Sequence, residues 1–386
     1  MINKEVVITK AENLTLTAFI EANKVQDILG YPDDPEKTFK TGDIYKAKVI
    51  NLQPNIGAAF LSLIPGVKAF MEIRGSSPVK PEQEIIVEIV KEAFGEKEMA
   101  VSPFYSLSGK YLVIKNASPS VSVSRKIAGE RRTELMELGN GLIKGFPDIS
   151  LIVRTNAAGA GNEEIVSEFE SLLSDISDLR KKASYSVPYI KLYSAPEPYM
   201  DYIRDLKEKP DRIVTDDPSI YEALRDHFKG DEELYSLIDL YSSESISLLK
   251  VSRLEAALDE IKKRTVHLKS GGTLIIDRTE ACHVIDVNSG KNTDKLTRKE
   301  LILKTNLEAV KEAARQIRLR NLGGMILFDL INMIERSDRN KVIAELKNEA
   351  FKDRLKCEFI DLTGLGIAEL TREKKNLPLS LPLEGC

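Results

Sequence analysis

The sequence predicts a mixed α/β protein of several domains, of the α+β multidomain kind. A series of short apolar runs at close spacing between residues 44 and 91 is typical of a small β-barrel. Three Ile-, Val- and Leu-rich runs between residues 271 and 333 read as strands, and a long charged helix separates the second from the third. The chain has 386 residues, enough for about two to four domains.

Composition sets limits on the class of protein. Hydrophobic residues make up 42% of the chain and charged residues 30%, as in soluble globular proteins. The net charge of −4 means that nucleic-acid binding would depend on local basic patches. No apolar run is long enough to span a bilayer, and residues 1–5 do not resemble a signal peptide. The three scattered cysteines, Cys282, Cys357 and Cys386, favour a cytoplasmic protein, and zinc is not expected because no CxxC pair is present.

The N-terminal part is expected to be β-rich. Alternating apolar residues at 6–9 and 14–20 predict a hairpin, and a polar linker is expected from Tyr31 onward. Runs at 44–50, 58–63, 67–73 and 84–91, separated by turn residues, predict a small barrel such as an OB-fold.

Two phenylalanines in this barrel region have two possible roles. Phe60 and Phe70 occur near basic residues that include Lys68, so they could form a platform on which bases stack. An isolated phenylalanine is more often part of a core. Both interpretations stay open at this point.

The middle of the chain mixes strands and helices. Strands are expected at 111–114, 121–126 and 151–155, and the turn at 159–164 leads into a helix with Asn162 as its cap. Residues 166–260 are expected to be mainly helical, with one short strand at 212–215.

Two aspartates occupy positions in apolar strands where an aliphatic residue would be expected. A carboxylate there is costly unless it is paired or binds a metal. Alternation puts Asp286 and Asn288 on one face of their strand, with His283 on the other. If the strand of Asp329 is its neighbour, the two carboxylates converge and suit magnesium or manganese. The alternative is that they cap loops at the strand ends.

The helix between these strands begins at a capping box formed by Thr297 and Glu300. One apolar stripe is expected to be buried. A neighbouring basic stripe, which includes Arg315 and Arg318, is either a solvated face or a contact for a phosphate backbone. A further helix is expected from Ser337, a last strand at 358–361 and an extended tail at 377–383.

Several segments together resemble the ribonuclease E/G endoribonucleases. The strongest are IDRTEACHVIDVNSGK (276–291), LKTNLEAVKEAARQIRLRNLGGMILFDLINM (303–333) and LTGLGIAELTREKK (362–375). GDIYKAKVINLQPNIGAAFLSL (42–63), VSVSRKI (121–127) and LIVRT (151–155) are also similar. Taken together in chain order these segments are specific to the family, and the resemblance extends over nearly the whole chain.

The resemblance implies a specific domain order. An RNase H-like domain would be split into residues 1–38 and 198–262. An S1-type OB domain would be inserted at 39–103, followed by a 5′-sensor region at 104–197. A DNase I-like catalytic domain would cover 263–378, with a C-terminal tail at 379–386.

The resemblance also implies an activity: cleavage of single-stranded, A/U-rich RNA, with a preference for 5′-monophosphorylated ends, in RNA processing or decay or in ribosomal RNA maturation. Asp286 and Asp329 match the catalytic, magnesium-binding aspartates, and Asn288 matches the accompanying asparagine. Arg154 and Thr155 match the pair that holds the 5′-phosphate. The RNA-binding candidates are Phe60, Phe70, Lys68, Arg125, Arg315 and Arg318.

Two departures from the family pattern qualify these expectations. The family usually has Asp-x-x-Asp after the Gly-Gly, whereas the second position here is Asn332, which reduces the negative charge near the site. The sequence ends at Cys386 without the CPxC motif through which two family chains share zinc, so a zinc-linked dimer is not expected and the oligomeric state stays open. The alternative function is an RNA-binding protein of the same fold with weakened catalysis.

Overall fold

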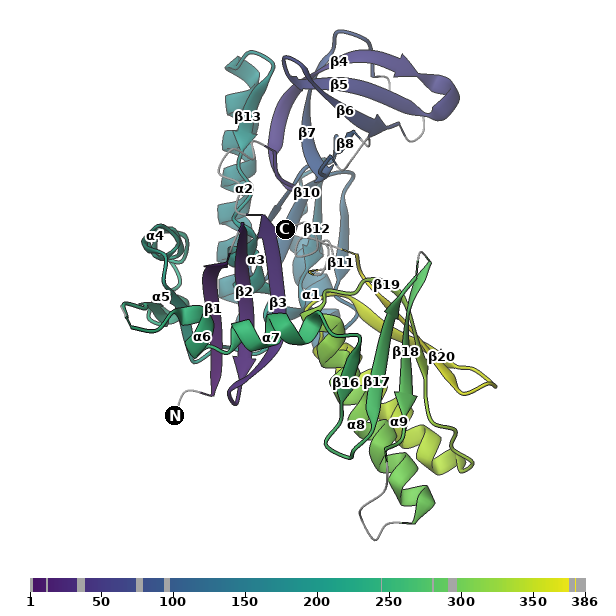
Figure 1. The fold of residues 1–386 in the computed structure, drawn as a ribbon. Helices are drawn as coiled ribbons and strands as arrows, with labels where there is room; N and C mark the ends of the chain where they lie inside the picture. The colour runs from purple at the N-terminus through teal and green to yellow at the C-terminus, as the bar shows by residue number, and fades with distance from the viewer. Residues whose placement is uncertain are drawn as a thin grey trace. The chain divides into compact units, whose positions relative to one another are not determined.

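The structure is a computed structural model, and it describes residues 3–11, 13–32, 39–73, 79–93, 98–243, 245–279, 281–290, 297–374 and 379. The chain forms two compact units, one of residues 1–34 with 198–386 and the other of residues 35–197. Their elements are shown in Figure 1. Among the described helices, none is long and apolar enough to cross a membrane. The prediction of a mixed α/β fold is confirmed.

The first sheet joins two segments that are far apart in sequence. It has the order β15-β14-β1-β2-β3, with β1, β2 and β3 antiparallel and with β14 and β15 running parallel to β1. The predicted hairpin is confirmed, but Tyr31 and Pro32 end a third strand rather than starting a linker. The strands are β1 (Lys4–Ala11), β2 (Leu14–Glu21), β3 (Lys24–Pro32), β14 (Arg212–Thr215) and β15 (Ile238–Leu240).

Helices cover both faces of this sheet. Alternation along β1 sends Val6 and Ile8 toward α3 and α4, whereas Val7 faces the core formed with α6, α7 and the end of α8. The helices of this part are α3 (Pro198–Asp205), α4 (Pro218–His227), α5 (Glu232–Tyr235), α6 (Leu248–Val251) and α7 (Leu254–Ile261).

A five-stranded barrel opens the second unit. Its strands follow the order β4-β5-β6-β8-β7, and pairing of β4 with β7 closes it. The four predicted strands are confirmed, and β8 is an additional one. β13 extends the sheet by pairing with β4. The elements are β4 (Ile44–Gln53), η1 (Pro54–Ile56), β5 (Ala58–Ile64), β6 (Val67–Glu72), β7 (Glu84–Lys91), β8 (Met99–Ser102) and β13 (Ile190–Tyr193).

The rest of the second unit is a four-stranded sheet with the order β11-β12-β10-β9, packed against two helices. The prediction that Asn162 caps the second helix is wrong by one residue: Gly161 is the N-cap, and the Glu164 carboxylate accepts its backbone N–H at 2.7 Å. The elements are β9 (Ser106–Ser108), β10 (Leu112–Asn116), β11 (Ser120–Val123), α1 (Gly129–Leu142), β12 (Ile149–Val153), η2 (Thr155–Ala158) and α2 (Asn162–Tyr185).

The C-terminal sheet belongs to the first unit and has the order β16-β17-β18-β19-β21-β20. Only one of its described pairings, β18 with β19, is parallel. The predicted capping box at Thr297 and Glu300 is confirmed. The elements are β16 (Thr265–His267), β17 (Thr273–Arg278), β18 (Cys282–Asn288), α8 (Arg298–Leu319), β19 (Gly324–Asp329), α9 (Arg336–Lys352), β20 (Cys357–Leu362) and β21 (Ile367–Arg372).

Helices α8 and α9 cover one face of the C-terminal sheet. Ile285 and Phe328 are buried against Val310 and Leu346 of these helices. The alternate residues of β18 and β19, such as Asp286 and Leu327, point to the opposite face, where their side chains are half-buried or exposed. The predicted strand at 358–361 is confirmed, but β21 follows it. Of the predicted extended tail, only Leu379 is described, and it is buried against the first sheet.

Candidate functional site

Two aspartates lie side by side on the open face of the C-terminal sheet. The parallel register of β18 and β19 pairs Asp286 with Asp329. Adjacent strands are about 4.8 Å apart, so paired residues project from the same face within reach of one ion. Asp286 is half-buried and Asp329 is exposed. The prediction that these residues converge at the end of the sheet is confirmed.

The surroundings of the pair combine apolar and polar groups. Ile275 of β17 and Ile367 of β21 flank the two aspartates in the same row of the sheet. Both isoleucines are half-buried, so an apolar side chain borders the aspartate pair on each side of the row.

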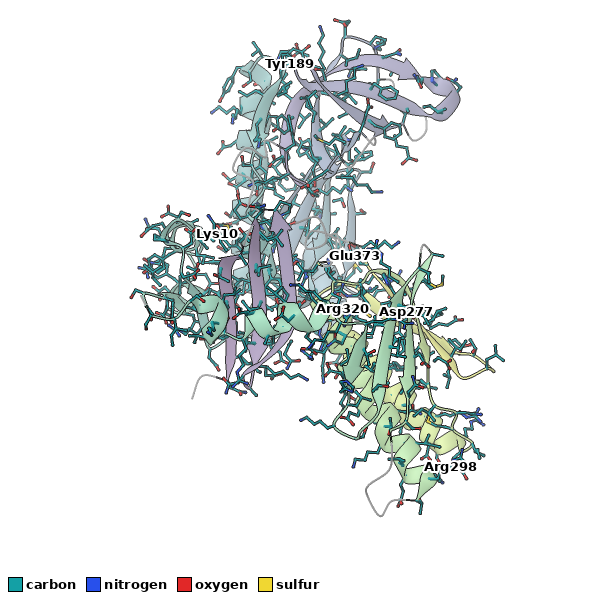
Figure 2. All side chains as sticks on the ribbon, viewed as in Figure 1. Lys10, Tyr189, Asp277, Arg298, Arg320 and Glu373 are labelled. Atoms are coloured by element: carbon teal, nitrogen blue, oxygen red, sulfur yellow. The ribbon has the colours of Figure 1, made fainter. Side chains whose placement is uncertain are left out.

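Asn288 supports the first aspartate directly. Its Nδ2 donates a hydrogen bond to Asp286 Oδ2 at 2.6 Å, as expected for two residues on one strand face. A third carboxylate on this face, Asp277, is engaged differently: Arg264 binds both of its oxygens, at 2.6 and 2.7 Å. Figure 2 labels Asp277 on the C-terminal sheet. This ion pair, through the hydrogen bond from Arg264, lowers the pKa of Asp277.

The donor set fits magnesium better than zinc. Within the described ranges, no group of three or more His, Cys, Asp and Glu side chains could hold a metal ion. Magnesium is commonly bound by one or two carboxylates and keeps several waters, whereas zinc sites use three or four protein ligands, mostly sulfur and nitrogen. Asp286 and Asp329 would supply the carboxylates, and Asn288 is the nearby amide.

Asn306 fixes the chain just beyond Asp329, although the sequence analysis did not single it out. Its side chain is fully buried on α8. Nδ2 donates to the Ile331 carbonyl at 2.8 Å, and Oδ1 accepts the Ile331 N–H at 3.1 Å. The path of the segment after β19 is therefore fixed two residues from Asp329. The available signal was helical spacing: Asn306 follows Leu303 by three residues and precedes Val310 by four, so it falls on the apolar face of the helix.

The basic stripe of α8 faces the protein interior at Arg315. This residue is 5% exposed. Its Nε donates to Glu312 at 2.9 Å and its Nη1 to the Val25 carbonyl at 2.9 Å, and it forms an ion pair with Glu260. The prediction that Arg315 contacts RNA is wrong, because its guanidinium joins α8 to the first sheet.

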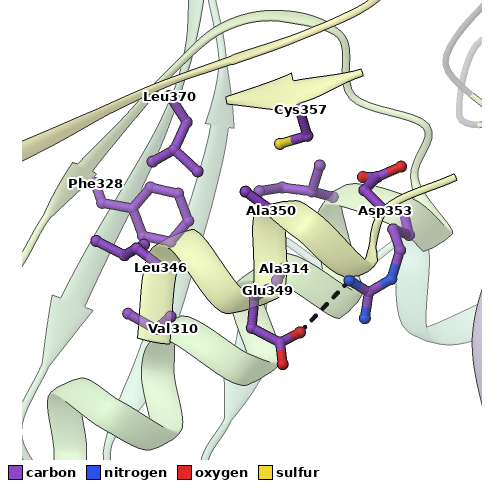
Figure 3. Close-up of a pocket in the computed structure, with 11 residues that line it drawn as sticks. Val310, Ala314, Phe328, Leu346, Glu349, Ala350, Asp353, Cys357 and Leu370 are labelled. Atoms are coloured by element: carbon purple, nitrogen blue, oxygen red, sulfur yellow. Dashed lines mark ion pairs between the residues drawn. The ribbon is translucent and has the colours of Figure 1, made fainter. Parts of the chain in front are cut away.

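Arg318 is also withdrawn from the surface. Its side chain is 12% exposed, and it contacts Glu349 at 3.5 Å and the Gln26 carbonyl at 3.3 Å. Figure 3 shows the ion pair of Glu349 beside a small cavity that Phe328 and Leu346 also line. The cavity measures about 10 Å³, near the lower limit for one water. The prediction of RNA contact is therefore wrong for Arg318 too.

In the second unit, two loops meet where parallel strands end. β11 and β12 are parallel and pair Val123 with Val153, so Ser124 and Arg125 leave the sheet beside Arg154 and Thr155. The Ser124 and Thr155 hydroxyl oxygens are 2.8 Å apart. Arg125 is exposed, and Arg154 and Thr155 are half-buried. Hydroxyl and guanidinium groups at one edge form a suitable environment for a phosphate.

Two consecutive arginines of α1 hold these loops in place. Arg132 Nη1 donates to the carbonyls of Val123 at 3.0 Å and of Ser124 at 2.8 Å. Arg131 Nη2 donates to the Ala160 carbonyl at 2.6 Å. The sequence analysis did not identify either role, because the partners are backbone carbonyls.

The two phenylalanines lie on the outer surface of the barrel. Phe60 and Phe70 are cross-strand partners with ring centroids 6.0 Å apart and planes at 73°. Both are half-buried, while their neighbours Leu61 and Ala69 are buried in the barrel. The alternative that both phenylalanines form the barrel core is therefore wrong. Lys68 is exposed on β6.

The sequence departs from the family pattern at Asn332 and at Cys386, and the structure describes the first of these two residues. Asn332 is exposed and follows the end of β19, outside the strand register that pairs Asp329 with Asp286. Cys386 lies outside the described residues.

Comparison with known proteins identifies the family. A model described as the ribonuclease E/G family matches residues 106–375, more than half of the chain. Proteins named Ribonuclease E are 31% identical over 89% of this chain in Haemophilus influenzae and 31% identical over 96% in Synechocystis. Ribonuclease G of Escherichia coli is 28% identical over 96% of this chain and is covered over 80% of its own length.

The extent of these matches differs between relatives. The chain spans 39% and 57% of the length of the two Ribonuclease E proteins, which is less than two thirds of either. The match to the family model nevertheless includes both aspartate strands and the loops around Arg154. The chain belongs to the ribonuclease E/G family.

Proposed function

We propose that this protein is a magnesium-dependent endoribonuclease that hydrolyses single-stranded RNA. The observation that carries the proposal is the register pairing of Asp286 with Asp329 on an open sheet face, in a chain of this family. Manganese is a possible substitute, because it shares the preference for oxygen ligands. The setting is cytoplasmic RNA processing or decay, or maturation of ribosomal RNA.

The residues of the site divide the chemical work. Asp286 and Asp329 would hold the ion, and the amide of Asn288 keeps the Asp286 carboxylate in one orientation. Magnesium bound there would lower the pKa of a bound water and neutralise charge on the scissile phosphate. In the reaction, water oxygen bonds to phosphorus while one phosphorus–oxygen ester bond breaks, and the leaving oxygen gains a proton.

A separate phosphate site at the ends of β11 and β12 would recognise a 5′-monophosphate. Arg154 would donate hydrogen bonds to the phosphate oxygens, and the Thr155 hydroxyl would add another. Arg125 is exposed beside them and would contribute charge. A terminal monophosphate carries more negative charge than a hydroxyl end, so this site would favour monophosphorylated RNA.

The barrel would select unpaired RNA. The edge-to-face pair of Phe60 and Phe70 offers aromatic surface on which unstacked bases can rest, and Lys68 can attract the backbone. Bases held in a duplex cannot stack in this way. A/U-rich segments, which pair weakly, would be the preferred substrates.

The domain assignments complete the proposal. The first sheet with its helices would be the split RNase H-like domain, the barrel the S1-type domain and the β9–β12 sheet the 5′-sensor region. The C-terminal sheet with α8 and α9 would be the DNase I-like catalytic domain.

A second function is favoured by one residue. Asn332 replaces an acidic residue of the family pattern, so less negative charge is present near the ion site. The alternative is therefore a protein that binds single-stranded RNA with weakened cleavage.

One assay separates these functions. A single-stranded A/U-rich RNA with a 5′-monophosphate or a 5′-hydroxyl is incubated with the protein, with magnesium or with a chelator. We expect magnesium-dependent cleavage that is faster for the 5′-monophosphate, and Arg154→Ala should reduce that preference. If the RNA binds in a filter-binding measurement but is not cleaved, the alternative function is favoured. An unchanged preference for the 5′-monophosphate in Arg154→Ala would refute the assignment of the phosphate site.

A further inference from the structure

One carboxylate in the second unit binds three consecutive backbone N–H groups. Glu168 of α2 accepts hydrogen bonds from Lys110 at 2.8 Å, Tyr111 at 2.8 Å and Leu112 at 2.7 Å. Bonds from N–H groups to a charged carboxylate are stronger than those between neutral groups. The turn before β10 is therefore attached to α2 at three successive residues.

The same turn holds Arg154 at two points. The Arg154 backbone N–H donates to the Tyr111 carbonyl at 2.7 Å. Its side-chain Nη1 donates to the Gly109 carbonyl at 2.8 Å. The position of both the backbone and the guanidinium of Arg154 therefore depends on a turn whose N–H groups Glu168 holds.

Because Gly109 has no side chain, the carboxylate of Glu168 can pack directly against its backbone. A Cβ added at Gly109 would lie 2.4 Å from the carboxylate carbon of Glu168 and 2.4 Å from one of its oxygens. Real Cβ atoms do not approach so closely, so a side chain at this position would displace the carboxylate. A change at either Gly109 or Glu168 should disturb the same contact.

We propose that Glu168 is a positioning residue for recognition of the RNA 5′-phosphate, acting through the turn at 109–112 on Arg154. This inference rests on the proposed function, because it assigns Glu168 to the phosphate site formed by Arg154 and Thr155. Glu168 itself does not touch the RNA in this arrangement. Its carboxylate accepts hydrogen bonds from the N–H groups of the turn and so fixes the turn in place. The fixed turn presents the Gly109 and Tyr111 carbonyls to Arg154.

The test compares cleavage of 5′-monophosphorylated and 5′-hydroxyl versions of one RNA, with kcat and KM measured separately. Glu168→Gln keeps the size of the side chain but replaces one acceptor oxygen with a donor that faces an N–H. We expect the ratio of kcat/KM for the two RNAs to fall by about 10-fold or more, as for other misplaced binding groups. Gly109→Ala should lower the ratio in the same way.

Two further variants make the test specific. Glu170→Gln alters an exposed glutamate on the same helix and should keep the wild-type ratio. The double variant Glu168→Gln/Arg154→Ala should have the ratio of Arg154→Ala alone, because both changes act on one contact. Circular dichroism of each variant checks that the total helix content stays that of the wild type.

The outcomes distinguish this inference from the proposed function. If the wild type prefers the monophosphate and Arg154→Ala loses the preference, an unchanged ratio in Glu168→Gln overturns only the role of Glu168. An equal loss of activity on both RNAs also overturns it, since that result indicates a general structural role. If the wild type has no preference, the proposed 5′-phosphate site fails, and this inference fails with it.

Discussion

Replacement of Asn306 by alanine should affect both stability and catalysis. The change removes two hydrogen bonds, at 2.8 and 3.1 Å, and leaves the N–H and the carbonyl of Ile331 without their side-chain partner. Each such bond contributes about 0.5–1.5 kcal/mol, and a buried polar group left unpaired costs about 1–3 kcal/mol. Because Asn306 is fully buried, we expect the free energy of unfolding to fall by about 2–4 kcal/mol.

The effect on catalysis follows from the position of Ile331. It lies two residues beyond Asp329, so a released segment would let the carboxylate move away from its partner on β18. A displacement of about 1 Å can lower a rate by about 100-fold. We therefore expect kcat to fall by about 10- to 100-fold, with a smaller change in KM.

Urea unfolding gives the stability change, and cleavage of a single-stranded RNA well below the unfolding midpoint gives kcat and KM. Asn348→Ala is the matched control, because Asn348 is exposed on α9 and makes one long contact with Glu345 at 3.5 Å. An unfolding free energy that matches wild type would refute the energetic reasoning. A destabilised variant with wild-type kcat would refute the role of Asn306 in positioning Asp329.

Three other predictions concern RNA binding and stability. Phe60→Ala and Phe70→Ala should each weaken binding of single-stranded RNA by about 1–3 kcal/mol in a filter-binding measurement, and unchanged affinity would refute the stacking role. Arg372→Met should destabilise the protein by about 3–5 kcal/mol in urea unfolding, because it leaves Asp353 buried without the Arg372 contact at 2.8 Å; a loss below about 1 kcal/mol would contradict this. Burial raises the pKa of Asp217, but hydrogen bonds from the start of α4 and from Lys10 outweigh it and lower the pKa to about 2. Because the folded-state pKa is depressed, this stabilisation is present above the unfolded pKa of about 3.9 and is lost as pH falls toward 2. The difference in unfolding free energy between wild type and Asp217→Asn should therefore shrink between pH 5 and pH 2, and a constant difference would contradict the assignment.

Local patterns were sufficient to predict the aspartate site. Alternation along a strand determines which face a residue occupies, so the shared face of Asp286 and Asn288 followed from the sequence alone. The pairing with Asp329 needed one assumption, that the two strands are neighbours, and the register confirms it. The capping box at Thr297 was predictable for the same reason, because its partner is three residues away.

Contacts between distant segments were not predictable in this way. The periodicity of α8 identified a basic stripe, but not that β3 would lie against it and offer the Val25 carbonyl to Arg315. β3 itself was missed because Gln26 and Asp27 interrupt its apolar pattern. Glu168 gave no signal, because its partners are backbone N–H groups, which every residue type except proline carries.

The central claim, that Asp286 and Asp329 hold the catalytic ion, is tested most directly by cleavage rates measured across a magnesium titration. Asp286→Asn and Asp329→Asn keep the shape of each side chain and remove its charge. The control is Asp277→Asn, which changes an aspartate of the same sheet that is paired with Arg264. The account predicts a loss of at least about 100-fold in kcat for the first two variants, since metal stabilisation is worth several kcal/mol, and a near-wild-type rate for the control. Cleavage by Asp286→Asn at the wild-type rate, with the same dependence on magnesium, would contradict it.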